Sequence, residues 1–218
     1  MVTISQVVAN IIAQKPFLSE AMSEGIVNLS SLARQIMPEV QQRIKEPVSL
    51  AAIGMALKRY SPQAEVVINI QLNKILDSLG DIIVRSDLAD ITYKNSDTLF
   101  EKHIMLLNEF KGKKEVFYTF VQGVYETNFI VSNVLKNSIT ELFKDEKIVA
   151  FYENLSSITI KLPAENTKLL GLYYYILKRI AWEGINIMEV VSSTNEFTII
   201  VKDEDIETAF SVVKNLRK

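Results

Sequence analysis

The order of helices and strands after residue 80 constrains the fold of this chain more than any other feature of its sequence. Residues 81–154 predict a strand, a helix, two strands, a second helix and a final strand, because runs rich in β-branched residues alternate with two amphipathic segments. Residues 155–218 predict a strand, a helix, two strands and a helix in the same order. This order recurs with a period of about 70 residues, which indicates an internal repeat.

Such a repeat is typical of the ferredoxin-like unit, an antiparallel sheet with both of its helices on one face. We therefore expect an α+β fold that contains two ferredoxin-like βαββαβ repeats. The first repeat spans residues 81–154, and the second repeat spans residues 155–218 and lacks its last strand. Each repeat would leave a sheet face and sheet edges open. The two repeats should pack together, and a homodimer or higher homo-oligomer would cover what remains.

Residues 1–62 predict a compact helical module. Apolar residues at helical spacing mark its first helix, and Asn28 or Ser30 is a good N-cap for a later one. That later helix must stop or kink at Pro38, so that "PEVQQRI" forms a short piece of its own. Pro47 is expected in the first turn of the last helix.

Residues 63–80 are ambiguous between a strand and a helix. β-Branched residues at the start of this segment favour a strand, whereas its later apolar residues follow a helical stripe. We expect a connecting helix that ends at Gly80.

The composition excludes several kinds of site. The chain has no cysteine, which removes disulfides, thiolate nucleophiles and zinc–cysteine sites, and its single histidine is His103. His103 is expected at a surface or boundary position of a helix, because spacing indicates no serine or carboxylate partner for it. The acids of "KDEDIE" lack the spacing of a calcium loop, so Asp203 or Asp205 should cap a helix. We expect no enzyme, no metal and no cofactor.

The charge and hydropathy patterns indicate neither a nucleic-acid footprint over the whole molecule nor a membrane segment. The net charge is -2, from 24 Lys and Arg against 26 Asp and Glu. The first residues lack a basic leader, and no apolar run reaches the about 18 residues that a spanning helix needs. We expect a soluble, cytoplasmic protein.

A more specific pattern occupies residues 163–213. Pro163 precedes Gly171 at the start of a predicted helix, "GINI" follows, Ser192 closes a strand, and "FTIIVKDEDIETAFSVV" ends the segment. This pattern resembles the ACT domain, above all the regulatory C-terminal ACT repeats of aspartate kinases. The first repeat fits only by its element order. The chain has no phosphate-binding glycine loop, so the resemblance does not extend to a kinase domain.

ACT domains hold a small ligand, usually an amino acid, at the interface of two ACT units, where a strand end meets the loop before the first helix. The resemblance therefore implies a site at the loop "LPAENTKLLG" and the following strand, with these candidate contacts: Asn166, Leu170, Gly171, Asn186 and Ile187. Backbone N–H groups near Leu170 and Gly171 would suit a carboxylate. This loop is longer than the usual ACT loop. The loop of the first repeat, "KNSDT", has neither proline nor glycine, so we expect the second repeat to bind.

The residues around Asn186 predict its orientation. Gly184 permits a left-handed helix cap, Ile185 and Ile187 should share one face of a strand, and Asn186 should lie on the other. Two interpretations stay open: Asn186 orients a ligand, or its side chain bonds the backbone of the turn.

The helical module resembles, less specifically, a helix-turn-helix or winged-helix domain, with "GIVNLSSLARQI" as support helix and "PVSLAAIGMALKRYS" as recognition helix. On this resemblance Ser49, Lys58 and Arg59 are the DNA-binding candidates. Six Lys and Arg against four Glu in the module are a weak positive bias. The apolar face of the second helix also fits packing inside a bundle or against a partner protein.

These features predict a regulatory protein that senses a small amino acid through tandem ACT repeats. The helical module would pass the signal to DNA, which would make the chain a transcriptional regulator, or to a partner protein. The alternative is a non-enzymatic oligomerisation and protein-interaction module without a small-molecule ligand.

Overall fold

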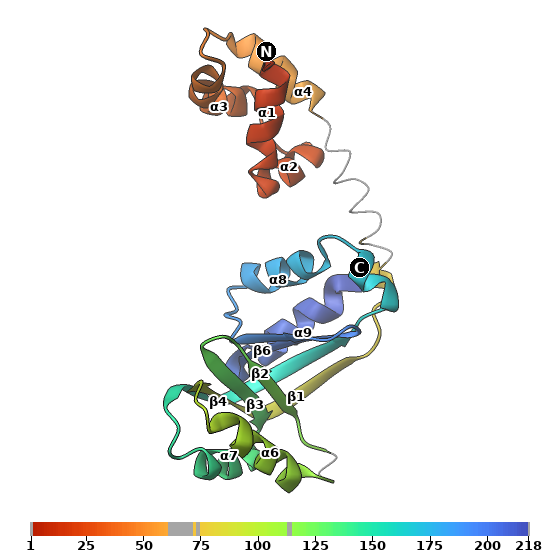
Figure 1. The fold of residues 1–218 in the computed structure, drawn as a ribbon. Coiled ribbons are helices and arrows are strands. Elements are labelled where there is room, and N and C mark those ends of the chain that lie inside the picture. The colour runs from red at the N-terminus through yellow and green to blue at the C-terminus, as the bar shows by residue number, and fades with distance from the viewer. Residues whose placement is uncertain (1, 61–71, 73–74, 113–114, 218) are drawn as a thin grey trace. The chain divides into compact units, whose positions relative to one another are not determined.

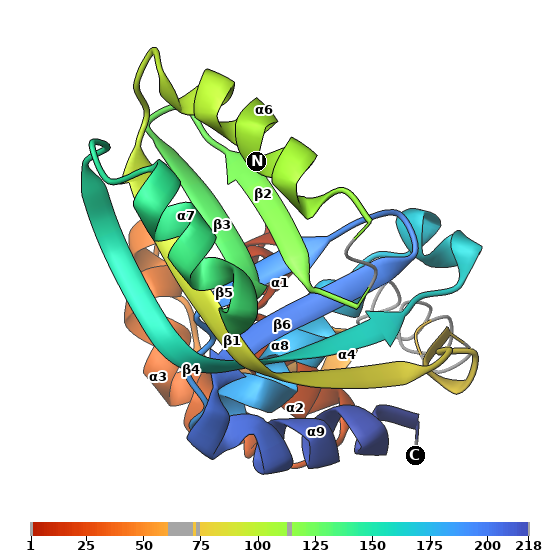
Figure 2. The same ribbon diagram turned by 90° about the horizontal axis from the view of Figure 1, so that it is seen from below.

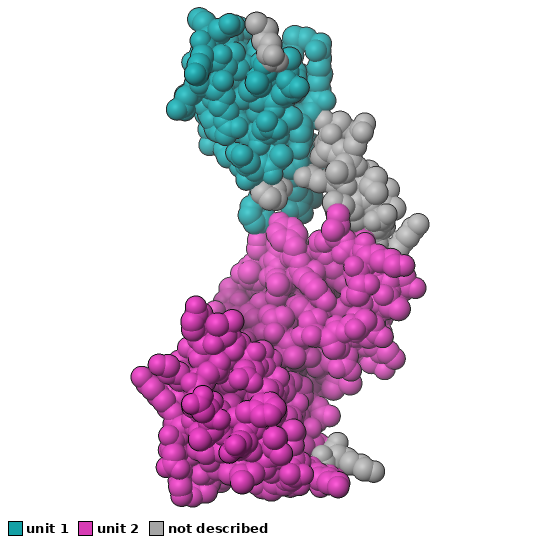
Figure 3. Space-filling model, in the orientation of Figure 1, with its two compact units in different colours: residues 1–71 teal, residues 72–218 magenta. Residues whose placement is uncertain are grey.

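The chain forms two compact units, unit 1 (residues 1–71) and unit 2 (residues 72–218) (Figure 3). The computed structural model describes these residues: 2–60, 72, 75–112 and 115–217. The connecting helix expected over residues 63–80 lies largely outside them, although Leu72, Leu76 and Leu79 are described and are buried in the core of unit 2. No helix within the described ranges is long and apolar enough to cross a bilayer.

The described part of unit 1 consists of helices α1 (Ile4–Ala13), α2 (Pro16–Ser23), α3 (Leu29–Ile44) and α4 (Leu50–Arg59) (Figure 1). Polar N-caps begin three of them: Thr3 for α1, Asn28 for α3 and Ser49 for α4. The apolar faces of α1, α3 and α4 meet in one core, whose buried residues are Val7, Val8, Ile11, Ile12, Leu32, Ala33, Ile36, Val40, Val48, Ile53, Ala56 and Leu57.

Helix α3 corrects the expectation that a helix stops at Pro38. It runs without a break through this residue. The proline removes one backbone hydrogen bond, but Ile36 and Val40 are buried in the core on either side of it, so that packing outweighs the loss. Helix α4 also begins later than expected, at Leu50 rather than at Pro47.

Unit 2 is built on a six-stranded antiparallel sheet with strand order β2-β3-β1-β4-β6-β5 (Figure 2). Its strands are β1 (Ile82–Lys94), β2 (Tyr118–Gln122), β3 (Glu126–Ser132), β4 (Ile148–Lys161), β5 (Glu189–Ser192) and β6 (Glu196–Lys202). Helices α6 (Leu99–Phe110) and α7 (Lys136–Leu142) cover one half of the sheet, and α8 (Leu172–Trp182) and α9 (Ile206–Lys214) cover the other (Figure 1). The α+β class is confirmed, and the elements follow in the predicted order except at residues 148–161.

One long strand, β4, replaces two of the predicted strands. The sequence predicts a last strand for the first repeat and a first strand for the second, and the structure joins them in 14 residues. Strand β1 is similarly long, and the two strands pair antiparallel along most of their lengths. They form the centre of the sheet.

Each central strand changes course at a residue with a left-handed backbone. Asp87 in β1 has φ of 59° and Asn154 in β4 has φ of 57°, and the register between the strands shifts beside both. Aspartate and asparagine adopt this conformation more readily than other non-glycine residues, and such an extra residue bends a strand. The next residues, Leu88 and Leu155, lie opposite each other. The two bends are therefore equivalent.

The bends divide each central strand between the two halves of the sheet. Beyond Leu88, β1 pairs with β3, and from Leu155 onward β4 pairs with β6. Residues 82–85 of β1 pair with residues 157–160 of β4. The first part of β1 thus occupies the sheet position that the second repeat would otherwise leave empty.

Successive side chains of these strands point to opposite faces of the sheet, and the buried ones form three separate hydrophobic clusters. Aromatic residues of β1, β3 and α7, such as Tyr93, Phe129 and Phe143, fill the core beneath α6 and α7. Aliphatic residues dominate beneath α8 and α9. A smaller cluster on the face away from the helices contains these residues: Leu88, Ile130, Leu155 and Ile200.

Candidate ligand site

A pocket of about 410 Å³ opens where β4 bends, beside the start of β5 and the end of β6. It is lined by these residues: Tyr152, Glu153, Asn154, Leu155, Met188, Lys202, Asp203 and Glu204. The left-handed backbone of Asn154 produces the bend, and strand β6 ends opposite it because Leu155 pairs with Lys202. Residues from three separate parts of the chain therefore meet in this pocket.

The pocket brings charges of both signs next to apolar side chains. The Lys202 ammonium lies 3.4 Å from a carboxylate oxygen of Glu204 and is 55% exposed, so it keeps donors for a ligand. Asp203 accepts a hydrogen bond of 2.5 Å from the buried hydroxyl of Ser156. Glu153 forms an ion pair with Lys136. A zwitterion with an apolar side chain would find a complementary group for each of its parts.

Asp205 is the N-cap residue of α9, one of the two positions expected, but its side chain makes no cap hydrogen bond. Neither the short 3-10 helix at Asp203–Asp205 nor α9 has a side-chain cap hydrogen bond. The buried Ser156 hydroxyl engages Asp203 instead, because a buried donor without a partner would cost free energy.

Two further carboxylates, Asp90 and Glu189, interact electrostatically on the side of the sheet away from the helices. Burial raises the pKa of Asp90, although hydrogen bonds from Asn128 and Thr92 act against this, and Asp90 is only 3% exposed. Burial and the charge of Asp90 raise the pKa of Glu189. Two strands separate β1 from β5 in the sheet, so the curl of the sheet brings these carboxylates within electrostatic reach. The sequence does not indicate that Asp90 and Glu189 interact, because they lie far apart along the chain.

The loop residues predicted to bind ligand lie at the N-terminal end of α8. Asn166 is buried, and its amide donates to the carbonyl oxygens of Pro163 at 2.7 Å and Thr194 at 2.8 Å. Gly171 is the N-cap of α8 with φ of 86°, and Leu170 is 72% exposed. The amide of Asn166 thus ties the loop to the turn between β5 and β6.

The other two predicted contacts lie beyond the opposite end of α8. Ile185 and Ile187 pack in the core, whereas Asn186 is exposed, as predicted. These residues do not lie in a strand, however, because β5 begins only at Glu189. In the described part of the chain, the Asn186 carboxamide makes no hydrogen bond to the backbone, and its nitrogen lies 3.5 Å from the sulfur of Met188. Met188 lines the pocket. The turn therefore places Asn186 beside the pocket.

Helix α8 separates the two groups of predicted contacts. An 11-residue helix is about 16 Å long at a rise of 1.5 Å per residue, so Gly171 and Asn186 lie at opposite ends of it. The structure brings Asn186 next to the pocket through Met188 and keeps Asn166, Leu170 and Gly171 apart from it. Ile187 packs against the core beneath α8 and α9 instead. The sequence analysis did not predict Lys202 and Asn154 as site residues. Their position at the ends of predicted strands, where polar residues from different elements can meet, could have indicated them.

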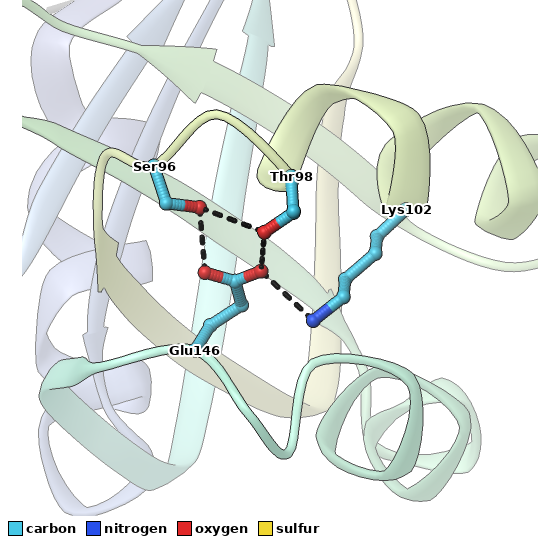
Figure 4. Close-up of polar contacts among 4 residues, drawn as sticks. All are labelled: Ser96, Thr98, Lys102 and Glu146. Atoms are coloured by element: carbon cyan, nitrogen blue, oxygen red, sulfur yellow. Dashed lines mark hydrogen bonds and ion pairs between the residues drawn. The ribbon is translucent and has the colours of Figure 1, made fainter.

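The corresponding loop of the first repeat already binds a carboxylate of its own chain (Figure 4). Glu146 accepts hydrogen bonds of 2.6 Å from the hydroxyls of both Ser96 and Thr98, and the Lys102 ammonium lies at 2.8 Å. The Glu146 side chain is only 5% exposed. Burial acts to raise the pKa of Glu146, but the donors from Lys102, Ser96 and Thr98 lower it to about 2. The donors at this loop are therefore already paired with a carboxylate of the same chain.

His103 is buried, which corrects the expected surface or boundary position. It is 8% exposed, stacks on Phe120 with ring centroids 3.6 Å apart, and lies 2.6 Å from the Tyr118 hydroxyl through Nε2. Burial lowers its pKa. The apolar Phe100 and Ile104 on the same helix are about half exposed instead. The aromatic residues of β2 give the histidine a partner that helical periodicity could not indicate.

The DNA-binding candidates occupy the two ends of α4. The Ser49 hydroxyl accepts a hydrogen bond of 3.2 Å from the backbone N–H of Ala52 as the N-cap of the helix. Lys58 and Arg59 are exposed in its last turn. Their role in DNA binding stays a prediction.

No protein-family model and no curated protein matches the sequence. Among solved structures, the chain is similar to the ligand-free regulatory subunit of aspartate kinase from Thermus thermophilus, with a TM-score of 0.53 and 15% identity over 64% of this chain and 99% of that one. The regulatory subunit from Thermus flavus gives the same values. Against the aspartate kinase of Clostridium acetobutylicum, the TM-score is 0.52 at 15% identity over 63% of this chain.

The chain spans only 34% of that Clostridium enzyme. At this level of identity the likeness concerns the fold alone. The curled six-stranded sheet with its helices is similar to the ACT regulatory parts of aspartate kinases, and the residues that the structure describes contain no kinase domain.

Proposed function

We propose that the chain is a regulatory protein that senses a small amino acid in the pocket beside Asn186. The pocket itself carries the proposal, because it combines the Lys202 ammonium, the carboxylates of Asp203 and Glu204, and the apolar side chain of Leu155. The lysine would pair with the ligand carboxylate and the acids with its ammonium group. The likeness to aspartate kinase regulatory subunits supports a regulatory role.

The ligand site of this proposal lies in the second repeat. In the first repeat Glu146 satisfies the donors of the loop before α6, so a ligand carboxylate would have to displace a buried, hydrogen-bonded group. In the pocket near Asn186 the Lys202 ammonium also contacts a carboxylate, that of Glu204 at 3.4 Å, but both side chains are exposed, so a ligand could replace this contact at lower cost. Asn186 would add a hydrogen bond to the ligand and Ile187 would support its segment. Asn166 and Gly171 would shape the loop at the other end of α8.

A thermal-shift and calorimetric screen of the whole chain against the twenty amino acids tests this assignment. A ligand at about one hundred times its Kd stabilises a protein by about 2.7 kcal/mol, which is a readily measured shift. We expect Lys202→Ala to abolish the shift and Lys214→Ala, which changes an exposed lysine outside the pocket, to preserve it. Absence of any shift at millimolar concentrations would contradict the amino-acid proposal.

The helical module would transmit the signal, with DNA as the proposed receiver. The exposed Lys58 and Arg59 at the end of α4 support this part of the proposal. A mobility-shift assay against genomic fragments, with and without the ligand from the screen, tests it. If the wild-type chain binds and Arg59→Ala does not, α4 contacts DNA; if neither binds, a protein receiver replaces DNA.

The second candidate function is an assembly module without a ligand. The half-exposed apolar side chains of Phe100 and Ile104 on α6 favour it. Under this alternative, Asn186→Ala changes no ligand response and leaves association intact. The amino-acid screen therefore separates the two functions.

A further inference from the structure

The first half of β4 is a sheet edge that no other strand of the described chain covers. Residues 148–152 pair with β1 on one side only, because β6 begins to pair with β4 at Leu155 (Figure 2). An unpaired edge presents a row of backbone N–H and C=O groups that can pair with another strand.

This free edge is apolar on both of its faces. Four of its large side chains are between 41% and 50% exposed: Ile148, Val149, Phe151 and Tyr152. Native edges are usually protected by charged residues, prolines or covering loops. Apolar side chains on both faces of an uncovered edge therefore indicate an interaction surface rather than a solvated edge.

The equivalent half of β1 shows how such an edge is protected in the same sheet. Its residues also pair on one side only, with β4. Arg85 lies on this edge and donates to the backbone carbonyl of Glu115 at 3.3 Å. Both edges carry exposed apolar residues, Ile83 and Val84 on β1, and both have exposed polar residues next to the bend. They differ at the position of Arg85, where β4 has Tyr152.

We propose that residues 147–153 of β4 pair antiparallel with the same residues of a second copy of the chain. This proposal does not depend on the amino-acid ligand. A two-fold axis at Ala150 places Ile148 opposite the partner's Tyr152 and Val149 opposite the partner's Phe151. Aromatic and β-branched residues form favourable cross-strand pairs.

Charge favours the same register. Lys147 would lie opposite the partner's Glu153, which also pairs with Lys136 of its own chain, and this arrangement occurs twice, once at each end of the paired segment. Self-pairing therefore satisfies the backbone edge, the apolar side chains and the terminal charges with one arrangement. A two-fold axis also closes the assembly as a dimer.

A single introduced cysteine tests the register directly, because the chain contains no cysteine of its own. Residues on the axis of an antiparallel pair have Cα atoms about 4.5–5.5 Å apart, which is within disulfide range. We expect Ala150→Cys to form a disulfide-linked dimer under mild oxidation. The matched control is Ile83→Cys, at the equivalent position of the protected edge, and it should remain largely monomeric on a non-reducing gel.

Sedimentation of a second pair of variants keeps the test independent of the cysteine. Phe151 is 41% exposed and Val84, its equivalent on β1, is 42% exposed. Phe151→Lys should weaken self-association at least tenfold, whereas Val84→Lys should leave it unchanged. Circular dichroism confirms that each variant is folded.

Three results would overturn the proposal. These are equal cross-linking of Ala150→Cys and Ile83→Cys, association of Phe151→Lys at the wild-type strength, and a monomeric wild-type chain at concentrations of tens of micromolar. Capture of a different protein on this edge, with the wild-type chain monomeric, would count as the last of these.

Discussion

At the residue scale, Glu146 shows how one side chain can complete a local structure. Its carboxylate joins the loop before α6 to the start of β4 through Ser96, Thr98 and Lys102 (Figure 4). These donors hold its pKa at about 2, below the ordinary value of 4.5. The ionised form is therefore more favourable in the folded chain than in the unfolded one.

We expect Glu146→Gln to lower the free energy of unfolding by about 1–2 kcal/mol at pH 7, after allowance for solvent screening. Because the folded pKa is depressed, this contribution is complete above pH 4.5 and is lost as the pH falls towards 2. Urea unfolding at pH 7, 4 and 3 measures the change. Glu141→Gln, which breaks an exposed ion pair with Lys144, is the control and should change stability by less than about 0.5 kcal/mol. A difference that persists unchanged at pH 3 would contradict this assignment.

The two asparagines of the predicted site differ in burial and should differ in effect. Asn166→Ala removes two hydrogen bonds that the buried amide donates to backbone carbonyl groups and should cost about 1–3 kcal/mol. Asn186→Ala changes an exposed side chain and should cost less than about 0.5 kcal/mol. Denaturant unfolding compares them, and equal costs would show that the loop does not depend on Asn166.

At the element scale, the bends in β1 and β4 mark where each central strand passes from one half of the sheet to the other. Each bend requires one residue in the left-handed region, Asp87 or Asn154. The bends change the direction of each central strand at the point where its outer partner begins, because β3 pairs with β1 from Leu88 and β6 pairs with β4 from Leu155.

We expect Asn154→Ala to destabilise unit 2 by about 1–2 kcal/mol, because alanine pays the steric cost of the left-handed conformation. Asn154→Gly should be close to neutral, because glycine adopts positive φ without that cost. Thermal unfolding of the two variants makes the comparison. If the alanine variant is as stable as the glycine variant, the bend is not strained.

At the scale of the whole molecule, the proposed pocket and the proposed dimer edge share residues. Tyr152 and Glu153 line the pocket and belong to the free edge of β4. Two binding events that share groups have a coupling free energy, and the coupling is reciprocal. Ligand binding should therefore change the strength of dimerisation.

Sedimentation with and without the amino acid found in the screen measures this coupling. We expect a change in the dimer Kd of about 5-fold or more, the lower bound of usual allosteric coupling. The Lys202→Ala variant should show the same Kd under both conditions, because it has lost the ligand. An unchanged Kd for the wild-type chain would mean that the pocket and the edge act independently.

The sequence alone determined most elements of unit 2 and their order, although not the continuity of β4. Alternation and helical periodicity are local properties, and they predicted β1, α6, β3 and α9 correctly. The orientation of Asn186 followed from the same local rules, because its neighbours Ile185 and Ile187 are apolar. These features depend on residues that are close in sequence.

Only the tertiary structure decided which distant residues meet. The burial of His103 against Phe120, the contact of Asp203 with Ser156 and the proximity of Asp90 to Glu189 each join separate elements. The first part of β1 occupies the position of the strand that the second repeat lacks for the same reason. Such pairings depend on the register and curl of the whole sheet, and a local pattern carries no information about either.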